Sequence, residues 1–489
     1  MEGFDKELEQ YGIFAKNGIK SFQENNITLI NADIEKIDFD IMHEKNIDNL
    51  KIQLSEIKNI IFSSTNSIQL HFFSCKFKNQ IKTRNIEFDN KIFFYQCTFE
   101  YIVDFSNTNF KDMINFHASR FKDEVRFIET RFLINPKINK TININFNEVD
   151  FENKVYFSKI SFNINLSFMY SRFRNDIVFK DIIFFKNIIN FYQIEFNNIK
   201  FIVVNNHKIK QTYFFKHSIF KGIINFQDLK IENLEFKDTV FNNIVVFDNT
   251  ILDNKPKFTN CTFSNQFNIK HDYIQYDYNE LKEKNKSTYD EFLNFRDLFR
   301  KLKSNRIAHH NLIDASELRA QELYARELEL KHKENKNLKD TIEQYQLFFY
   351  RKLCDHHTDL ILNLKWLIIT IGMFASMLFM IKLYKHGLCI LNAFNFYGLY
   401  LSALGSFILS ALALFRCIDK MKAFVSINAI AILWVICYKP KLIFGIANLI
   451  GDNSYNAFEN LLITLYTLIA GLIIFSLQKT ARKNTIIPN

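Results

Sequence analysis

Glycine and proline are scarce in this sequence, at 11 and 4 of 489 residues. Loop-rich enzymes need more of both at their turns, so this scarcity favours a repetitive chain over an ordinary enzyme fold. The seven cysteines form no CxxC pair and lack the density of a secreted disulfide scaffold, which argues against disulfides and structural zinc. No P-loop, GxSxG, HExxH or dinucleotide fingerprint occurs. We therefore expect no enzyme activity and assign no catalytic, cofactor-binding or metal-binding residue.

Phenylalanine is abundant, at 55 residues, and it recurs in a regular order. Its spacing alternates between five and six residues through Phe94, Phe99, Phe105, Phe110, Phe116, Phe121, Phe127 and Phe132. Interruptions at 133–148 and 202–214 are each followed by a return of the same spacing. Neither spacing fits the helical period of about 3.6 residues, so each phenylalanine is expected to mark one short strand of a coil. Four strands per coil give about 22 residues a turn, and roughly eight coils over residues 88–263.

A second inward-facing position is expected two residues before each phenylalanine. In one half of the repeats it holds the small residues Thr108, Ser119, Thr130 and Ser171, and in the other half the branched residues Ile114, Val125, Val155 and Ile177. This alternation is typical of strands that fill different corners of one narrow interior. Cys75, Cys97 and Cys261 occupy the same position, so we interpret them as small buried side chains and not as ligands or nucleophiles.

Segments such as VDFSNTNFKDMINFHASRF and INFQDLKIENLEFKDTVF resemble the pentapeptide-repeat family in its Phe-rich, eleven-residue variant. The resemblance covers residues 70–265 well and residues 30–69 loosely. It implies a right-handed quadrilateral β-helix, a β-solenoid with the central phenylalanines inside. Some relatives mimic DNA, which requires an acidic rod, whereas residues 61–270 hold 28 Lys and Arg against 20 Asp and Glu. No arginine stripe with exposed aromatic residues stands out either, so we expect no nucleic-acid partner.

Past residue 270 the pattern becomes helical. Ser287 to Glu291 form a capping box for a helix with apolar Phe292, Phe295, Phe299 and Leu302, which we expect to cover the open end of the solenoid. A second helix at about 311–335 places Glu322, Glu327 and Glu329 four residues before Arg326, Lys331 and Lys333, and these pairs predict a solvated arm. Its stretch NLIDASELRAQELYARELE resembles the connector that many pentapeptide-repeat proteins place before a C-terminal membrane domain.

Two clusters have a metal-like composition: His309-His310 and Cys354-Asp355-His356-His357. Adjacent side chains on a helix diverge by about 100°, so neither cluster converges on one ion unaided. We favour solvated or interfacial residues over a metal site. The scattered His117, His207, His217 and His271 lie outside the inward register and are expected to face solvent.

The last quarter of the chain is apolar enough for several membrane spans. We predict spans at 360–381, 389–415, 423–438 and 458–477. The apolar piece at 442–450 either continues the third span or forms a re-entrant or interfacial segment.

The basic residues of the loops set the expected orientation. With four spans, Arg416, Lys420, Lys422 and the C-terminal tail lie on the side of the solenoid, whereas Lys382, Lys385, Lys439 and Lys441 lie opposite. This slight bias favours a cytoplasmic solenoid. The first residues also lack the basic patch and apolar run of a signal peptide. We expect a multi-pass protein of the cell inner membrane.

The expected organisation is an N-terminal cap with irregular repeats (1–60), a β-helix (61–270), a helical connector (271–358) and a membrane domain of about four helices (359–489). The first functional hypothesis is a membrane-anchored scaffold whose solenoid binds an unidentified protein partner, because a solenoid offers extended surface and no preformed cleft. The lipid bilayer and a homo-oligomer through the membrane domain are further expected contacts. The alternative is a channel-like or transport protein regulated by the solenoid, for which Glu459 is the acidic residue to test, although an interfacial charge is the simpler interpretation.

Overall fold

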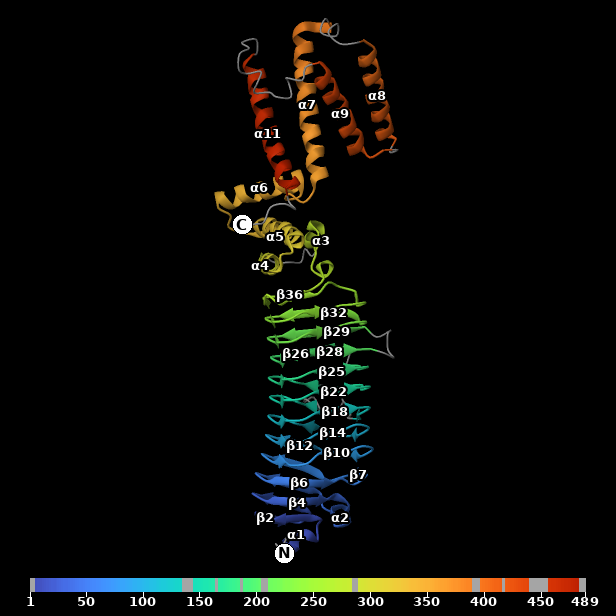
Figure 1. The fold of residues 1–489 in the computed structure, drawn as a ribbon, viewed down its shortest axis with the longest axis vertical. Coiled ribbons are helices and arrows are strands. Elements are labelled where there is room, and N and C mark those ends of the chain that lie inside the picture. Colours follow the sequence, from blue (N-terminus) through green and yellow to red (C-terminus); the bar gives the residue numbers. More distant parts are fainter. Residues whose placement is uncertain are drawn as a thin grey trace. The chain divides into compact units, whose positions relative to one another are not determined.

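The computed structural model describes residues 5–482 except for 134–143, 163–165, 185–187, 204–209, 284–288, 389–395, 416–417 and 439–455. The chain divides into two compact units, residues 1–275 and 276–489. The first unit is a β-solenoid and the second is helical (Figure 1).

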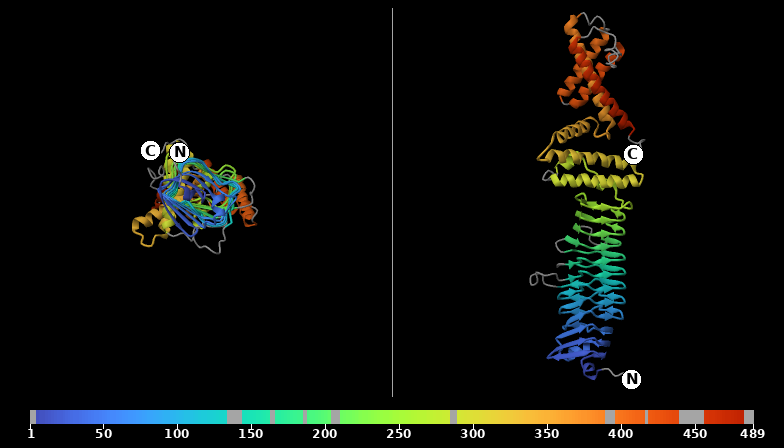
Figure 2. Two further views of the ribbon diagram at one scale, coloured as in Figure 1. Left: turned by 90° about the horizontal axis from the view of Figure 1, so that it is seen from below. Right: turned by 90° about the vertical axis from the view of Figure 1, so that its left-hand side faces the viewer.

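The first unit is a β-solenoid of about ten turns over residues 26–263. Successive strands visit four faces in turn, and each strand pairs in parallel with the strand one coil later, as Phe99 does with Phe121 and Phe88 with Phe110. The predicted β-solenoid with coils of about 22 residues is therefore confirmed. The stack also starts earlier than the phenylalanine register, because irregular coils precede it. The end-on view in Figure 2 shows the coils following one another around one interior.

The strands of each face pair along the stack into sheets, and the strands of the second face belong to two separate sheets. The first face contains β1 (Ile13–Lys16), β4 (Asp33–Asp38), β6 (Glu56–Ile61), β9 (Lys76–Phe77), β13 (Thr98–Phe99), β17 (Arg120–Phe121), β21 (Asp150–Phe151), β24 (Arg172–Phe173), β27 (Glu195–Phe196), β30 (Ile219–Phe220), β33 (Val240–Phe241) and β37 (Thr262–Phe263). The second face contains β2 (Ile19–Gln23), β3 (Asn26–Ile30), β5 (Asn49–Gln53), β8 (Gln69–Phe73), β12 (Ile92–Tyr95), β16 (Ile114–Asn115), β20 (Ile144–Asn145) and β23 (Leu166–Ser167), then β26 (Ile188–Tyr192), β29 (Gln211–Lys216), β32 (Lys230–Lys237) and β36 (Lys257–Thr259). Strand β35 (Ile251–Leu252) precedes β36 in the same coil and pairs with Lys230 and Ile231, the first residues of β32.

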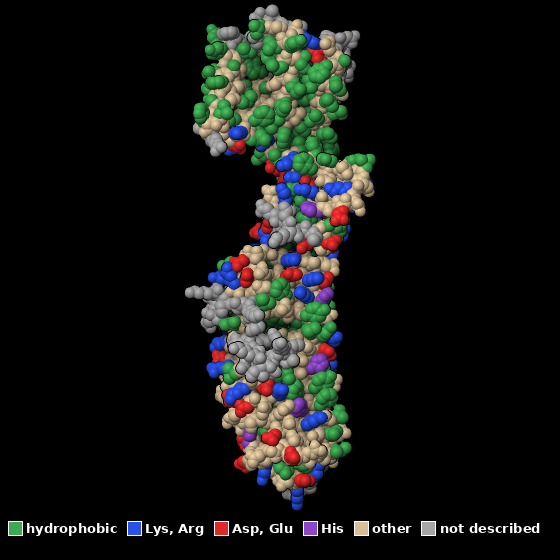
Figure 3. Space-filling model, turned by 180° about the vertical axis from the view of Figure 1, so that it is seen from behind, with side chains coloured by type: hydrophobic (Ala, Val, Ile, Leu, Met, Phe, Trp, Pro, Cys, Tyr) green, Lys and Arg blue, Asp and Glu red, His purple; other side chains and the backbone are tan. Residues whose placement is uncertain are grey.

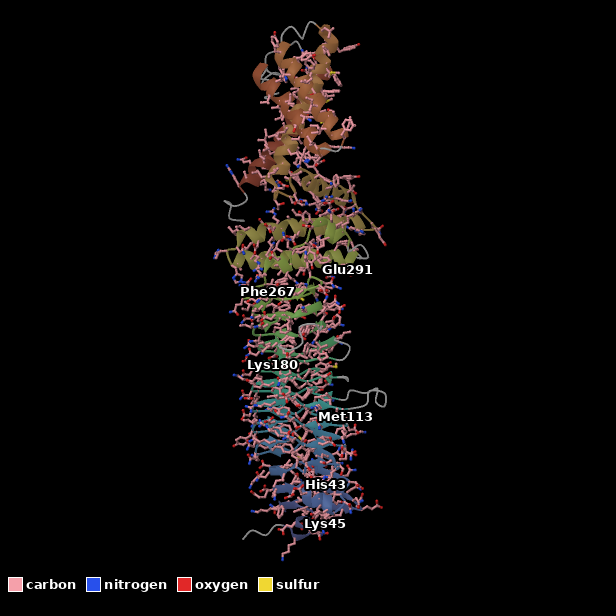
Figure 4. All side chains as sticks on the ribbon, turned by 90° about the vertical axis from the view of Figure 1, so that its right-hand side faces the viewer. His43, Lys45, Met113, Lys180, Phe267 and Glu291 are labelled. Carbon is pink, nitrogen blue, oxygen red and sulfur yellow. The ribbon has the colours of Figure 1, made fainter. Side chains whose placement is uncertain are left out.

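The third and fourth faces complete each coil. The third face contains β10 (Ile81–Lys82), β14 (Val103–Asp104), β18 (Val125–Ile128), β22 (Val155–Ser158), β25 (Ile177–Lys180), β28 (Ile199–Ile202), β31 (Ile224–Asn225) and β34 (Val245–Val246). The fourth face contains β7 (Thr65–Asn66), β11 (Glu87–Phe88), β15 (Asn109–Phe110) and β19 (Arg131–Phe132). Side chains along a strand alternate between the interior and the surface, and Lys180, labelled in Figure 4, is on the outward side of β25.

The interior is filled by stacked phenylalanine rings. Along the axis, the rings of Phe99 and Phe121 lie 4.5 Å apart between centroids and nearly parallel, at 5°. Rings on neighbouring faces meet edge to face instead, as Phe94 and Phe99 do at 5.3 Å and 70°. Each buried phenylalanine stabilises the stack by about 1.5–3 kcal/mol through loss of apolar surface from water.

The small inward-facing residues are buried, as predicted, and they also donate hydrogen bonds. Ser119 Oγ donates to the carbonyl of Phe94 at 2.9 Å, and Thr130 Oγ1 donates to the carbonyl of Phe105 at 2.8 Å. The thiol of Cys97 makes the same contact with the carbonyl of Phe72 at 3.4 Å. These side chains therefore satisfy carbonyl groups of the preceding coil that would otherwise lack a partner inside the solenoid. The prediction that Cys75, Cys97 and Cys261 are small buried side chains is confirmed.

Left-handed residues form the corners within the five-residue steps. They include Asn85, Gln96, Asn107, Ala118 and Glu129, which are eleven residues apart; after Glu148 the same interval recurs at Lys159, Tyr170 and Asp181. Left-handed backbone costs a non-glycine residue roughly 1–2 kcal/mol, and polar side chains such as Asn tolerate it best. The ladder of hydrogen bonds on either side holds these corners in place, which explains how a chain with so little glycine makes so many sharp turns.

Both ends of the solenoid unit depart from the repeat. At the N-terminal end, α1 (Lys6–Glu9) and α2 (Phe39–Glu44) bury Leu8, Phe39 and Met42, and β1 pairs antiparallel with β4. At the other end, the Phe267 ring packs 4.5 Å from that of Phe263, shortly before a 3-10 turn (His271–Tyr273). Irregular termini of this kind protect the edge strands from pairing with other chains.

The second unit contains eight described helices. They are α3 (Tyr278–Glu283), α4 (Tyr289–Ala308), α5 (Leu312–His332), α6 (Leu338–Cys354), α7 (Leu360–His386), α8 (Phe396–Leu414), α9 (Lys420–Tyr438) and α11 (Ala457–Ala481). Three segments are long and apolar enough to cross a membrane: Leu360–Lys385, Tyr397–Leu414 and Ala457–Ala481. They coincide with three of the predicted spans. Helix α9 covers the predicted third span, and the piece 442–450 lies outside the described residues.

Helices α7 and α11 lie side by side and run antiparallel. Asn363 near the start of α7 donates to Ser476 near the end of α11 at 2.9 Å, and the ring of Phe374 stacks on that of Tyr466 at 3.9 Å. The chain thus enters and leaves this bundle at the same end. The face of the bundle in Figure 3 is covered largely by hydrophobic side chains, as expected for helices that contact lipid.

Helix α4 confirms the predicted helix after residue 289, whereas the Ser287 end of its capping box lies outside the described residues. The prediction that the next helix is a solvated arm is wrong. In α5, Glu327 and Glu329 are buried, and their ion pairs reach other helices instead of residues four positions along. The helix is held between α4 and α6, and a charge pattern along one helix cannot reveal partners on others.

Candidate interaction surfaces

The first face of the solenoid carries charges whose sign alternates from coil to coil; we call it the ionic face. The charged residues that flank its inward phenylalanines are, in successive coils from β9 onward, Lys76 and Lys78; Glu100; Arg120 and Lys122; Asp150 and Glu152; Arg172 and Arg174; Glu195; and Lys221. Neighbouring coils therefore pair through these side chains: Lys122 with Glu100 at 3.0 Å, and Arg174 with Asp150 at 2.6 Å.

Ion pairs between neighbouring coils offset part of the positive charge of the ionic face. Lys122 lowers the pKa of Glu100, and Asp150 raises the pKa of Arg174, each chiefly through a hydrogen bond. Each such exposed pair contributes at most about 1 kcal/mol, and the alternation places acidic residues next to basic residues of the neighbouring coils. A count of charges over residues 61–270 does not reveal this order. Comparing residues one full coil apart would have revealed it.

The second face exposes stacked rings, which we call the aromatic column: His71, Phe73, Phe93, Tyr95 and His117. The rings of Phe73 and Tyr95 lie 4.6 Å apart at 17°, and those of His71 and Phe93 lie 4.7 Å apart at 11°. Phe73 is 42% exposed. Burial and the nearby Lys51 and Lys91 lower the pKa of His71, which favours its neutral, apolar form.

Two pockets on the described solenoid surface are open to solvent. One pocket of about 500 Å³ is lined by Arg120, Glu148, Asp150, Tyr170 and Arg172 among others. Its charges already belong to the ionic face, since Arg120 lies 3.7 Å from Asp150. This pocket lacks the apolar, enclosed lining that a small-molecule site usually has.

The family comparison matches this part of the chain. The family model described as pentapeptide repeats (9 copies) covers residues 94–133, the region of the solenoid from β12 to β19. Residues 94–133 are pentapeptide repeats. No curated protein and no solved structure matches the chain. The resemblance noted in the sequence, and the β-solenoid that it implied, are confirmed.

In the helical unit, buried ion pairs join α4, α5 and α6. Glu327 accepts two hydrogen bonds from Arg351, at 2.7 and 2.8 Å, and the Arg351 guanidinium lies 3.6 Å from the centre of the Tyr278 ring. Glu329 pairs with Arg296 at 2.7 Å. Glu343 and Glu329 raise the pKa of Arg326 further above its usual range. This network makes the connector a packed assembly of helices.

The tripeptide Asp355-His356-His357 links α6 to α7 with three successive left-handed residues. His356 is 7% exposed, and burial lowers its pKa to about 3, so of the two expected environments, solvated or interfacial, the solvated one does not apply to this residue. Burial also lowers the pKa of His357 to about 4. The left-handed turn places both rings against the helices. The prediction assumed that these residues lie on a helix, and it therefore did not include this arrangement. The expectation is right for His309 and His310, which are exposed.

His357 is the centre of a polar contact between this turn and the last helix. Its Nδ1 lies 3.3 Å from both Ser476 Oγ and Thr480 Oγ1 and 3.5 Å from Cys354 Sγ. Burial raises the pKa of the Cys354 thiol, so it is not an activated nucleophile. Within the described residues no three His, Cys, Asp or Glu side chains converge as a metal site would require. The cluster therefore serves to attach α11 to the turn.

The four scattered histidines have different positions in the structure. His117 and His217 lie on the surface of the solenoid outside the inward register, as predicted, and His217 is 44% exposed at its side chain. His271 is only partly exposed, and His207 lies outside the described residues.

Glu459 at the start of α11 is engaged in structural contacts. It caps the helix by accepting from the backbone N–H of Asn456 at 2.9 Å, and it pairs with Lys385 at 2.9 Å and Lys382 at 3.9 Å. The carboxylate thus ties the start of α11 to the end of α7. These contacts account for a buried acidic residue in this bundle without a transported ion.

Proposed function

We propose that this pentapeptide-repeat protein is a membrane-anchored scaffold without catalytic activity. Its helical unit spans the cell inner membrane, and its solenoid lies in the cytoplasm and binds another protein. The observation that carries the proposal is the combination, in one chain, of a rod-like stack with continuous exposed faces and three helices able to cross a membrane. A solenoid of this kind suits the display of an extended binding surface.

The aromatic column is the surface that we expect the protein partner to cover. Stacked, partly exposed rings are already ordered, so a partner that buries them loses little side-chain entropy. Aromatic residues are also enriched among those that dominate binding energy. The ionic face is a poorer candidate, because its charges are satisfied by neighbouring coils.

Site-specific photo-crosslinking in native membranes tests this assignment. The crosslinking residue replaces Phe93 in the column or, as a matched control, Tyr101, an aromatic residue that is 54% exposed outside the column. We expect a discrete protein adduct from position 93 and not from position 101. Adding Phe73→Ser should reduce the adduct about tenfold, as expected for loss of a dominant binding residue. Equal adducts from both positions, or no effect of Phe73→Ser, would contradict the assignment.

Orientation is tested separately with a reporter that is active only in the cytoplasm. Fusion after Asn489 should give an active reporter, and fusion after Gly387, beyond the first span, an inactive one. The reverse result would place the solenoid on the other side of the membrane. Ion flux into proteoliposomes tests the alternative of transport. Because the Glu459 carboxylate is already paired with Lys385, we expect both the unmodified protein and Glu459→Gln to give the same flux as empty vesicles. A flux that Glu459→Gln abolishes would favour transport over the scaffold.

A further inference from the structure

Helix α6 carries an apolar stripe that no described part of its own unit covers. Leu338, Ile342, Tyr345 and Phe349 recur at the spacing of one helix face, and they are 78%, 58%, 71% and 44% exposed. We call these four residues the α6 stripe. Phe348, beside it, is 47% exposed. So many large apolar side chains on one exposed face mark an interaction surface.

The opposite side of α6 is occupied by the connector. Glu343 accepts from Arg326 on α5 at 2.8 Å, and Arg351 donates to Glu327 on α5 at 2.7 Å. Leu347 is buried on this side as well. These ion pairs hold the polar side of α6 against α5, and they thereby determine the direction in which the α6 stripe faces.

The α6 stripe turns toward the membrane helices. Leu353, one turn beyond Phe349 on nearly the same side of α6, packs with Ile473 of α11 and with Trp366 and Leu367 of α7. Figures 1 and 2 show α6 lying across the end of the bundle at which α7 begins. The stripe therefore begins next to the contact with α7 and α11 and continues away from these two helices. If a bilayer surrounds α7 and α11, the stripe lies along its surface.

The depth of this contact fits the interfacial region of a bilayer. Trp366 follows the start of α7 by six residues, which places it about 9 Å along the helix axis. Its indole N–H donates to the carbonyl of Lys352 on α6 at 2.8 Å. Tryptophan is enriched at this level of membranes, and interfacial helices bury their apolar face by about 5–10 Å.

We propose that α6 is an interfacial helix whose stripe lies among the lipid headgroups and upper acyl chains on the side where α7 begins. This inference rests on the proposed membrane anchoring and adds a lipid-binding surface to it. Lys339 and Lys352, at the two borders of the stripe, are placed to reach headgroup phosphates. Because the connector is held to α6 by buried ion pairs, the membrane surface would hold the connector at a defined height.

Quenching of tryptophan fluorescence by brominated lipids tests the proposal on the full chain reconstituted in phosphatidylcholine and phosphatidylglycerol vesicles. Tyr345→Trp places the probe on the stripe, Phe349→Trp repeats the measurement one turn away, and Gln344→Trp is the matched control on the side of α6 that faces away. The unmodified chain, with Trp366 and Trp434, supplies the background. Far-UV circular dichroism identical to that of the unmodified chain verifies folding.

We expect lipids brominated near the headgroup to quench the added fluorescence at 345 and 349 by about half, more than lipids brominated near the chain ends, and to leave position 344 nearly unchanged. Equal quenching at all three positions, or none at 345 and 349, overturns the proposal. In that case a second copy of this chain or another protein, and not lipid, would cover the stripe. Failure of the unmodified chain to enter vesicles at all would instead refute the membrane anchoring.

Discussion

Replacing Phe121 by alanine tests whether the solenoid is stabilised coil by coil. Phe121 is 1% exposed, and its ring stacks on those of Phe99 at 4.5 Å and Phe151 at 5.1 Å and meets Phe116 edge to face at 5.5 Å. Loss of the buried surface costs about 1.5–3 kcal/mol, and each lost ring pair adds to it, so Phe121→Ala should cost about 4 kcal/mol.

Hydrogen exchange measured by mass spectrometry on the full chain resolves where that loss occurs. About 4 kcal/mol corresponds to nearly a thousandfold faster exchange for amides protected by local opening. We expect the effect in β17 and the adjacent β13 and β21, with distant coils unchanged, because contacts in a solenoid reach only neighbouring repeats.

Two controls make this result decisive. Phe121→Leu keeps most of the volume and should cost less than about 1.5 kcal/mol, and Tyr101→Ala removes an exposed ring and should leave exchange unchanged. Unchanged exchange in Phe121→Ala would show that the ring does not fill the interior. Faster exchange spread evenly over all coils would show that the stack opens as one cooperative block.

Three further predictions concern the polar interior and the helical unit. Ser119→Ala leaves the buried carbonyl of Phe94 without its donor and should cost about 1–3 kcal/mol, measured by exchange in β17, whereas Ser119→Cys should restore most of the protection. Arg351→Met leaves Glu327 buried and unpaired and should destabilise the helical unit by about 3–5 kcal/mol in a denaturant titration; an unchanged midpoint would refute the ion-pair network. His357 has a folded pKa of about 4, below its unfolded value, so stability present above about pH 6.5 should fall as the pH drops to about 4, and His357→Gln should flatten this dependence.

The solenoid interior can be read from the sequence because one residue type repeats at a spacing that no helix shares. Phenylalanine and the position two before it locate the strands and their burial without knowledge of the neighbouring coil. The hydrogen bond from Ser119 to Phe94 could not be found this way, since it joins residues one coil apart at a corner. The alternation on the ionic face is likewise visible only after the coil length is known.

The connector was harder to predict because its contacts follow no period. Rules for charge pairs on one helix suit an exposed helix, but Glu327 and Glu329 of α5 find their partners on α6 and α4. The burial of His356 depends on three left-handed residues in a row, a conformation that these residue types rarely adopt together. The long apolar helices were predictable from the length and apolarity of their segments. The exposed stripe of α6 could be recognised only once the positions of the neighbouring helices were known.

Alternating charge on the ionic face restricts how this rod could be lengthened. Duplicating a single coil would set equal signs side by side at the junction, for example a second Arg120 and Lys122 directly above the first. Duplicating two consecutive coils restores the order of acid and base at every step. Designed or natural extensions of this stack should therefore be tolerated best in even numbers of turns.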